Sequence, residues 1–187
     1  SYRVGFECEW EWKISPSWTF YTNQYLAVNA IQNYTHTIPT FNPDYSVNES
    51  LSERIFYPIT DIANSPNWIS YAELRYSPWK NTKLHLMNKV VSQQYLDNTG
   101  SNLKSLPMYT FTNLALLHTI PGMKRFREIT LQLLLNNILN NHYIPRGYTY
   151  HSGNALDNSG IITRGMDYNY FYPQAGFHVL MGLNLKF

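Results

Sequence analysis

The sequence has few charged residues, a single cysteine and no long apolar run. Charged residues make up 14% of its 187 residues, against about 25% in a typical soluble domain. Because Cys8 stands alone, an internal disulfide framework and a cysteine-based zinc site are excluded. No stretch approaches the roughly 20 apolar residues of a membrane helix, which excludes a helical membrane protein. The net charge of +2 comes from scattered Lys and Arg, so no dedicated nucleic-acid binder is expected.

Aromatic residues are abundant instead. They reach 16% of the chain, with 16 Tyr, 9 Phe and 5 Trp, and the polar balance is carried by Asn, Thr, Ser and Gln. This mixture favours strands over helices. The chain starts at Ser1 without a Met, a basic segment or an apolar leader. We therefore expect that a targeting segment has been removed or that the chain begins inside a larger protein.

Both ends of the chain alternate with a period of two. From Tyr2 to Ile14 every even position is apolar and every odd position is polar or Gly. From Phe177 to Phe187 the odd positions are apolar, and Leu180 is the single apolar exception among the even ones. Such alternation is typical of a strand with one apolar and one polar face.

The same pattern recurs between the ends and predicts seven strands in all. For residues 133–139 a helix is the alternative, but the Asn136-Asn137 and Asn140-Asn141 pairs have poor helix propensity. The predicted strands cover residues 2–14, 18–38, 67–76, 82–95, 108–118, 128–143 and 177–187.

The predicted connections alternate between short and long. Residues 15–17, 77–81 and 119–127 are short turns, whereas residues 39–66, 97–107 and 144–172 are long and rich in Asn, Ser, Pro, Gly and Tyr. Amphipathic strands joined in this way are typical of a transmembrane barrel with short periplasmic turns and long extracellular loops. A soluble sandwich does not segregate its connections so consistently.

Aromatic residues gather at one predicted level of the sheet. They flank the short turns, where an interfacial girdle would lie, and the alternative is that they fill a soluble core. The residues at this level are Trp10, Trp12, Trp18, Phe20, Tyr76, Trp79, Phe126 and Phe187.

Seven strands cannot form a complete single-chain barrel. Bacterial barrels have an even number of strands and both termini on the periplasmic side, and an open sheet in lipid leaves costly unpaired backbone groups on each edge. We therefore predict an all-β fold in which residues 1–187 form one antiparallel sector of a transmembrane barrel. The remaining strands belong to the same protein or to a separate chain.

Three stretches resemble the C-terminal barrel of TonB-dependent outer-membrane receptors, in a style closest to those of Bacteroidota. They are Lys89 to Thr99, Thr130 to Asn140 with Tyr143 and Gly147 to Tyr150 after it, and Tyr172 to Phe187. The resemblance implies the last seven strands of a 22-stranded barrel, a plug domain and a TonB box. The plug and the TonB box have no counterpart within residues 1–187.

The resemblance also implies location and partners. The location is the bacterial outer membrane, and the partners are outer-membrane lipid, the remaining strands and plug, and the TonB complex acting through the plug. A further implied partner is the barrel-assembly machinery, which reads a C-terminal signal. Gly182, Leu185 and Phe187 match that signal, whereas Leu180 stands where a polar residue is usual.

No motif for catalysis, cofactor binding or metal binding is recognisable. The six histidines lie far apart without metal-ligand spacing, and no phosphate loop, nucleophile elbow or convincing carboxylate pair occurs. We therefore expect neither an enzyme nor a bound cofactor.

The segment from residue 146 to residue 172 is the candidate ligand-binding site. Its aromatic and cationic side chains suit stacking on a ligand and hydrogen bonding to it; the alternative is a tyrosine-rich loop that packs on its neighbours. The candidate residues are Arg146, Tyr148, Tyr150, His151, Arg164, Tyr168 and Tyr170.

The function that the resemblance to TonB-dependent receptors implies is TonB-driven uptake of a scarce nutrient such as a siderophore, haem, a vitamin or an oligomer. One alternative is a small standalone barrel that acts as an adhesin or structural protein, with residues 161–172 as an eighth strand. A second alternative is a soluble β-sandwich that binds a ligand or catalyses a reaction.

Overall fold

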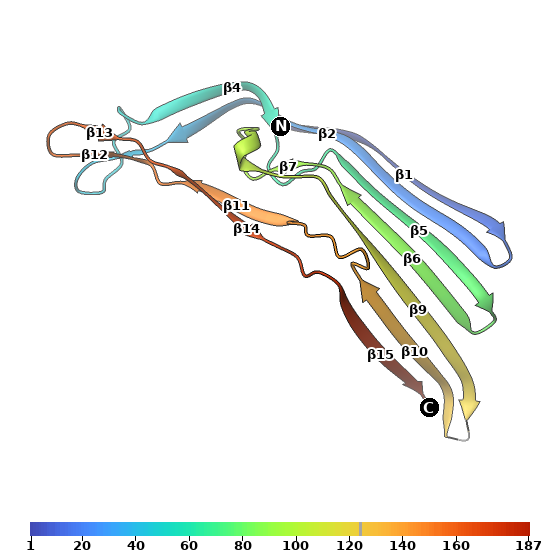
Figure 1. Cartoon of the computed structure of the whole chain (residues 1–187). Coiled ribbons are helices and arrows are strands. Elements are labelled where there is room, and N and C mark those ends of the chain that lie inside the picture. Colours follow the sequence, from blue (N-terminus) through green and yellow to red (C-terminus); the bar gives the residue numbers. More distant parts are fainter. Residues whose placement is uncertain (124) are drawn as a thin grey trace.

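The computed structural model describes residues 1–123 and 125–187, and nearly all of it is antiparallel β structure (Figure 1). The main sheet has eight strands, and seven of them follow one another across it in chain order and correspond to the seven predicted from the sequence. They are β1 (Tyr2–Ser15), β2 (Trp18–Ile38), β5 (Trp68–Trp79), β6 (Thr82–Val91), β9 (Tyr109–Met123), β10 (Phe126–Asn136) and β15 (His178–Lys186).

An eighth strand extends the upper part of this sheet. Strand β4 (Glu53–Asp61) pairs with the second half of β2, from Ala30 to Ile38. It lies within residues 39–66, which the sequence predicts as a loop. The pairing depends on the unusual length of β2, 21 residues, which β5 and β1 leave partly uncovered.

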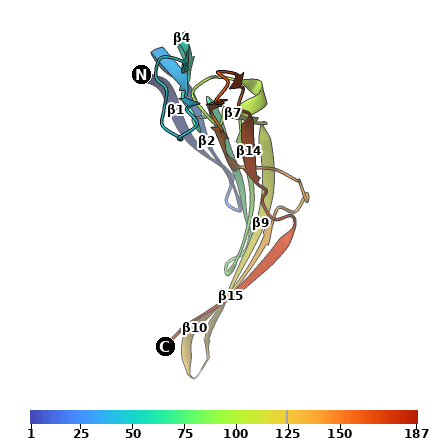
Figure 2. The same ribbon diagram turned by 90° about the vertical axis from the view of Figure 1, so that its left-hand side faces the viewer.

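The sheet is an open, curved single layer. Strands β1 and β15 form its two edges, and they are not paired with each other. Figure 2 shows the sheet from the side as a narrow bent band. The short turns and the C-terminus lie at one end, and the N-terminus and the long connections at the other (Figure 1). The first strand therefore runs from the long-loop end to the turn end.

Several strand ends differ from the prediction. Strand β10 stops at Asn136 and not near residue 143, because Asn137 and Asn140 adopt positive φ angles of 49° and 51°, which Asn tolerates better than most residues. The predicted turn at 119–127 is mostly strand, since β9 reaches Met123 and β10 begins at Phe126. Lys124, within that turn, lies outside the described residues.

The register gives the sheet one apolar and one polar face. Directly opposed residues of antiparallel strands point to the same side, and the pairs Val4 with Val28 and Phe6 with Leu26 lie on the apolar face. Val4 and Phe6 are 66% and 64% exposed. Among the described residues, the buried apolar side chains are only Ala30, Val91, Leu96 and Leu106, far too few for a soluble domain of this length.

Aromatic rings gather at the turn end of the sheet, as the sequence predicts. Trp18 stacks on Tyr76 with 4.1 Å between ring centroids, and Phe126 lies 5.1 Å from Phe187. Trp10 and Trp12 stack at 6.1 Å. These ring pairs lie in the parts of the strands that adjoin the short turns.

The long connections are largely paired strands rather than irregular loops. Strands β11 (Arg146–His151) and β14 (Asp167–Tyr172) form a hairpin, while β3 (Thr40–Phe41), β12 (Asn154–Leu156) and β13 (Ile162–Thr163) form a small sheet. Strands β7 (Gln94–Tyr95) and β8 (Ser105–Leu106) pair on either side of a 3-10 turn, η1 (Asn102–Lys104).

The positions of these small sheets bear on the two alternative folds, a small standalone barrel and a soluble β-sandwich. Residues 167–172 pair with β11 and not with the main sheet, so they do not supply the eighth strand of a closed small barrel. The small sheets lie beyond the long-loop end of the main sheet and not across its face (Figure 1), which does not match a sandwich. Within the described ranges, no helix is long and apolar enough to span a membrane.

Candidate ligand-binding site

The β11–β14 hairpin carries a ladder of five tyrosines on one face. In its register Tyr148 lies opposite Tyr170, and Tyr150 lies opposite Tyr168. Their ring centroids are 4.9 Å and 5.1 Å apart, with interplanar angles of 10° and 17°. Tyr172 continues the row, 6.2 Å from Tyr148. We refer to Tyr148, Tyr150, Tyr168, Tyr170 and Tyr172 as the tyrosine ladder.

The ladder presents ring edges and hydroxyl groups. Because neighbouring rings stack on one another, their faces are partly covered, while each side chain stays between 37% and 58% exposed. Partial desolvation raises the pKa of Tyr148, and a hydrogen bond with Tyr170 raises the pKa of Tyr150. The phenols of Tyr148 and Tyr150 therefore stay protonated at neutral pH and act as uncharged hydrogen-bond donors and acceptors.

Two of the predicted site residues lie away from the ladder. His151 belongs to the other face of β11, where its Nδ1 accepts a hydrogen bond of 2.9 Å from the Gly153 amide, so it supports the turn. Arg164 is exposed and follows β13. The structure thus brings Arg146, Tyr148, Tyr150, Tyr168 and Tyr170 together on one hairpin face and separates His151 and Arg164 from them.

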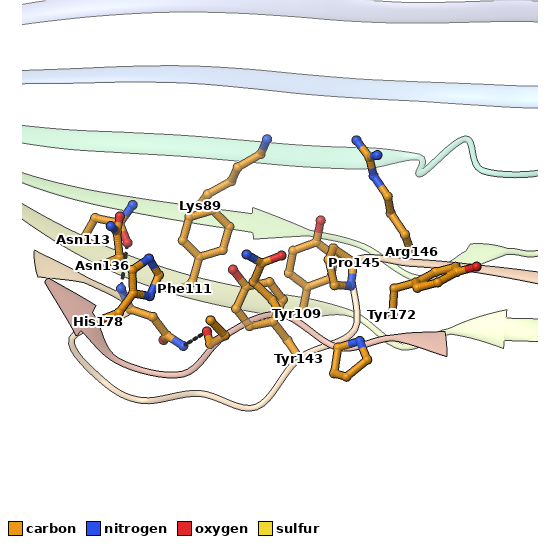
Figure 3. Close-up of a pocket in the computed structure, with 14 residues that line it drawn as sticks. Lys89, Tyr109, Phe111, Asn113, Asn136, Tyr143, Pro145, Arg146, Tyr172 and His178 are labelled. Atoms are coloured by element: carbon orange, nitrogen blue, oxygen red, sulfur yellow. Dashed lines mark hydrogen bonds between the residues drawn. The ribbon is translucent and has the colours of Figure 1, made fainter. Parts of the chain in front are cut away.

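A concave pocket lies below the hairpin, on the polar inner face of the main sheet (Figure 3). Its volume is about 570 Å³, within the usual range for small-molecule sites. Arg146 and Tyr172 line the pocket and also belong to the ladder face, so the two features are continuous. The other lining residues are Lys89, Tyr109, Phe111, Asn113, Asn136, Asn137, Tyr143, Pro145, Pro173, Gln174, Ala175 and His178. We call it the inner-wall pocket.

One wall of the inner-wall pocket is aromatic. The Tyr143 ring stacks on Tyr109 at 5.0 Å and on Phe111 at 5.3 Å, with interplanar angles of 11° and 8°. Tyr109 and Phe111 are alternate residues of β9 and share its inner face. Tyr143 reaches them from the segment after β10, where Asn137 binds the Asn141 backbone.

Most of these pocket residues were not identified as site residues from the sequence. Lys89, Tyr109 and Phe111 lie on strands that look like ordinary wall, and neither spacing nor motif links them to residue 146. The sequence does indicate which face they occupy, because the odd-numbered positions of β6 and β9 lie on the polar face of the sheet. Their convergence depends on the register between strands, which the sequence does not state.

The hairpin is held in place by a buried lysine. Lys104 Nζ lies 3.2 Å from Asp97 Oδ2 and 2.7 Å from Asp167 Oδ1, and the Asn169 side-chain amide donates to the Leu103 carbonyl at 3.0 Å. The Lys104 side chain is 10% exposed. We call this ion-pair cluster the Lys104 clamp; it joins the η1 turn to β14.

Within the clamp, the pKa of Asp97 and the pKa of Lys104 are shifted in opposite directions. Burial alone raises the pKa of the Asp97 carboxyl, but hydrogen bonds from Thr99 and from Lys104 outweigh it, so the pKa is lowered. Burial alone lowers the pKa of the Lys104 ammonium, but Asp167 and Asp97 outweigh it, so the pKa is raised. Both groups are therefore charged across the neutral range.

A polar network crosses the inner face nearer the turn end. Glu73, 8% exposed, accepts from Arg75 Nη2 at 2.9 Å and lies 2.5 Å from His85 Nδ1. Arg75 Nη1 also binds Glu11 Oε2 at 3.1 Å. The network joins β1, β5 and β6, which fixes charged side chains on the inner face without burying any of them unpaired.

The C-terminal signal residues lie on β15 and just beyond it. Gly182 is opposite Gln132 on the inner face, and Leu185 is opposite Ile129 on the apolar face. Phe187 packs against Phe126 at the turn end. In the described part of the chain, no three His, Cys, Asp or Glu side chains are grouped so that they could hold a metal ion.

Comparison with solved structures identifies the class of fold. The siderophore receptor PiuA of Acinetobacter baumannii matches 99% of this chain with a TM-score of 0.67 at 14% identity. The ferric yersiniabactin uptake receptor FyuA of Yersinia pestis matches 97% of it with a TM-score of 0.53, also at 14% identity. No family model matches the chain, and no curated protein matches it.

The chain thus has the antiparallel fold of a section of receptor barrel wall. It spans about 22% of the length of each of these two receptors. The name of each of these two proteins describes a receptor.

Proposed function

We propose that the chain is the C-terminal wall of a TonB-dependent transporter in the bacterial outer membrane. The observation that carries the proposal is the main sheet itself: seven antiparallel strands in chain order, extended by β4, with an apolar outer face, a polar inner face and edge strands β1 and β15 that do not pair with each other. A closed barrel of 22 strands would satisfy both edges, as a bilayer requires. The neighbours' likeness supports the fold of such a wall.

The proposed cargo is a scarce nutrient, and a ferric siderophore is the class that the neighbours' names favour. The segments 39–66, 97–107 and 144–172 then face the cell exterior, and the short turns face the periplasm. Arg146 and the tyrosine ladder, together with the inner-wall pocket, would contact cargo on its way into the barrel. The similarity to Bacteroidota receptors remains a prediction.

The mechanism needs no catalysis. Extracellular loops capture the cargo, the inner wall supplies polar contacts, and TonB acts on a plug that would be contributed by the rest of the transporter. The apolar face of the sheet contacts outer-membrane lipid, and Gly182, Leu185 and Phe187 would present the signal that the barrel-assembly machinery reads.

Uptake of radiolabelled ferric siderophore by cells that produce the complete transporter tests this proposal. Uptake should need both the transporter and TonB, whereas binding at the cell surface should persist without TonB. The transporter should also fractionate with the outer membrane and migrate differently on gels before and after heating. Uptake that is unchanged in cells lacking TonB would contradict the proposal.

A further inference from the structure

Polar side chains interrupt the apolar outer face of the main sheet near its middle. Directly opposed residues point to the same side, so the even-numbered positions of β2, β5, β6 and β9 continue the apolar face of β1. Six polar residues occupy positions of this face on four adjacent strands. They are Thr22, Gln24, Ser70, Asn88, Thr110 and Thr112, and we call them the outer polar patch.

The patch consists of two consecutive rows across the sheet. Strands β2, β5, β6 and β9 lie side by side and are paired on both sides within this chain (Figure 1), so the rows do not depend on any further strand. From β2 to β9, one row is Thr22, Ala72, Asn88 and Thr112, and the next is Gln24, Ser70, Val90 and Thr110.

The patch lies at the depth of the bilayer core in the proposed transporter. A barrel strand takes about 9–11 residues to cross the bilayer. The stacked rings of Trp18 and Tyr76 mark the turn end, and Thr22 and Gln24 follow Trp18 by only four and six residues. They therefore lie far from both headgroup layers, among hydrocarbon tails that offer no hydrogen bonds.

Hydrogen bonds within the patch satisfy part of its polar groups. Gln24 Nε2 donates to Thr22 Oγ1 at 2.8 Å and to Ser70 Oγ at 2.7 Å. Asn88 Nδ2 donates to Thr110 Oγ1 at 3.1 Å. The hydroxyls of Ser70 and Thr110 accept these bonds, and neither donates one to a group in the described residues. In the same residues, Asn88 Oδ1 accepts no hydrogen bond.

We propose that the outer polar patch is the surface through which two copies of the transporter associate within the membrane. The patch is uncharged and has unused donors at Ser70 and Thr110 and an unused acceptor at Asn88. A surface with both kinds of group is complementary to itself when a second copy is turned about a two-fold axis, the commonest symmetry of protein dimers. The inference rests on the proposed membrane-spanning barrel and goes beyond its transport function.

Short side chains at the centre of the patch allow a close contact. Ala72 lies in the middle of one row, whereas the rows on either side of the patch carry Phe20 with Leu74 and Leu26 with Trp68. Two backbones approach most closely where the side chains between them are short, as small residues show between membrane helices. Close approach brings the unused groups of the two copies within hydrogen-bond distance and excludes lipid from between them.

Energy transfer between two labelled pools of the complete transporter in lipid vesicles tests the inference. Raising the ratio of lipid to protein dilutes the transporter in the membrane and gives an apparent dissociation constant. We expect the wild-type protein to show transfer that falls on dilution. Asn88→Leu removes the acceptor and Thr110→Val removes a donor, so each should raise the dissociation constant about tenfold.

Thr82→Val is the matched control for Thr110→Val. Both substitutions remove one hydroxyl from a threonine of the outer face, but Thr82 lies beside the turn end, where it bonds to His118 at 2.9 Å. Thr82→Val should leave the dissociation constant unchanged. Heat-modifiable migration of each variant reports whether the barrel is folded.

Photocrosslinking identifies what contacts the patch in living cells. Benzoylphenylalanine is placed at Leu86, which lies on the outer face beside Asn88 and is 40% exposed. We expect a product with twice the mass of the transporter that contains only the transporter. The same group at Leu183, on the outer face of β15 and away from the patch, should give little of this product.

Three results would overturn the inference: monomers at every lipid ratio, a dissociation constant unchanged in Asn88→Leu and Thr110→Val, or crosslinks only to lipid or to a different protein. None of them bears on the cargo or on TonB. Uptake that does not need TonB contradicts the proposed function instead, and leaves a dimer formed through the patch standing.

Discussion

Tyrosine has two structural roles in this chain: some tyrosines form the exposed ladder, and others line the inner-wall pocket. Tyr148 and Tyr150 belong to a stacked row that is partly exposed, whereas Tyr109 and Tyr143 build the wall of a pocket. Replacing Tyr148 and Tyr150 by Ala should weaken cargo binding about tenfold or more, because both stacking and hydrogen bonds are lost. Titration of the complete transporter measures this change.

Two controls sharpen that prediction. Phe in place of both tyrosines keeps the stacked rings and removes only the hydroxyls, so an intermediate affinity is expected. Phe171→Ala alters the opposite face of β14 and should leave affinity intact. If the Ala double variant binds like the wild type while remaining folded, the ladder has a structural role only.

The Lys104 clamp gives a second prediction at the residue scale. Lys104→Met leaves Asp97 and Asp167 without their shared cation, which should weaken the docking of the hairpin by about 1–3 kcal/mol; Asp167 is 42% exposed, so the low end applies to that partner. Faster hydrogen exchange in residues 146–151 and 167–172 measures the loss. Lys104→Arg should restore most of the protection, and no change in Lys104→Met would remove the clamp as the cause.

The same clamp should depend on pH in a defined direction. The pKa of Asp97 is lowered in the folded chain, so its contribution is present above its unfolded pKa of about 4 and is lost as pH falls through the lower folded value. The pKa of Lys104 is raised, so its contribution is present below about 10.4 and is lost as pH rises through the higher folded value. Hairpin protection should therefore form a plateau between these limits.

At the scale of elements, substitutions at two glycines on the inner face should differ in their effect on stability. A Cβ at Gly5 would lie 2.7 Å from Ala27 Cβ and 2.8 Å from the Leu26 carbonyl oxygen, so Gly5→Val should destabilise the β1–β2 pairing by about 1–3 kcal/mol. A Cβ at Gly182 would lie 3.5 Å from Gln132, an ordinary contact. Urea unfolding in detergent should detect the first change and not Gly182→Ala.

Gly182→Ala is therefore suited to testing the assembly signal apart from stability. If the machinery reads Gly182, Leu185 and Phe187, this variant should reach the outer membrane in smaller amounts while unfolding at the same urea concentration as the wild type. Normal amounts in the membrane would show that Gly182 is not part of the signal.

Strands with a clear alternating pattern could be predicted from the sequence, whereas strands that form only against a particular neighbouring strand could not. Strands β1 and β15 alternate almost perfectly, so both were predicted to within one or two residues. Strand β4 was missed because it needs the long arm of β2 as a template, and β11 and β14 because their tyrosines read as a loop. Four of the five ladder residues were predicted from composition, and Tyr172 was not among them. Lys89 and Tyr143 were missed because their proximity to residue 146 depends on strand register and on the path of the chain after β10.

At the scale of the whole molecule, the open sheet predicts that residues 1–187 alone will not behave as a soluble domain. Two unpaired edges and a bare apolar face favour association. Size-exclusion chromatography without detergent should show aggregates, and detergent should be needed for a defined species. A monodisperse monomer in plain buffer would contradict the barrel assignment.

The length of β2 carries a consequence for the cell surface. A strand needs about 9–11 residues to cross a bilayer, and β2 has 21, about 70 Å of chain at 3.3 Å per residue. In the proposed transporter, roughly half of β2 would extend beyond the lipid on the extracellular side, with β4 paired alongside it. Antibodies against residues 53–61 should consequently stain intact bacteria.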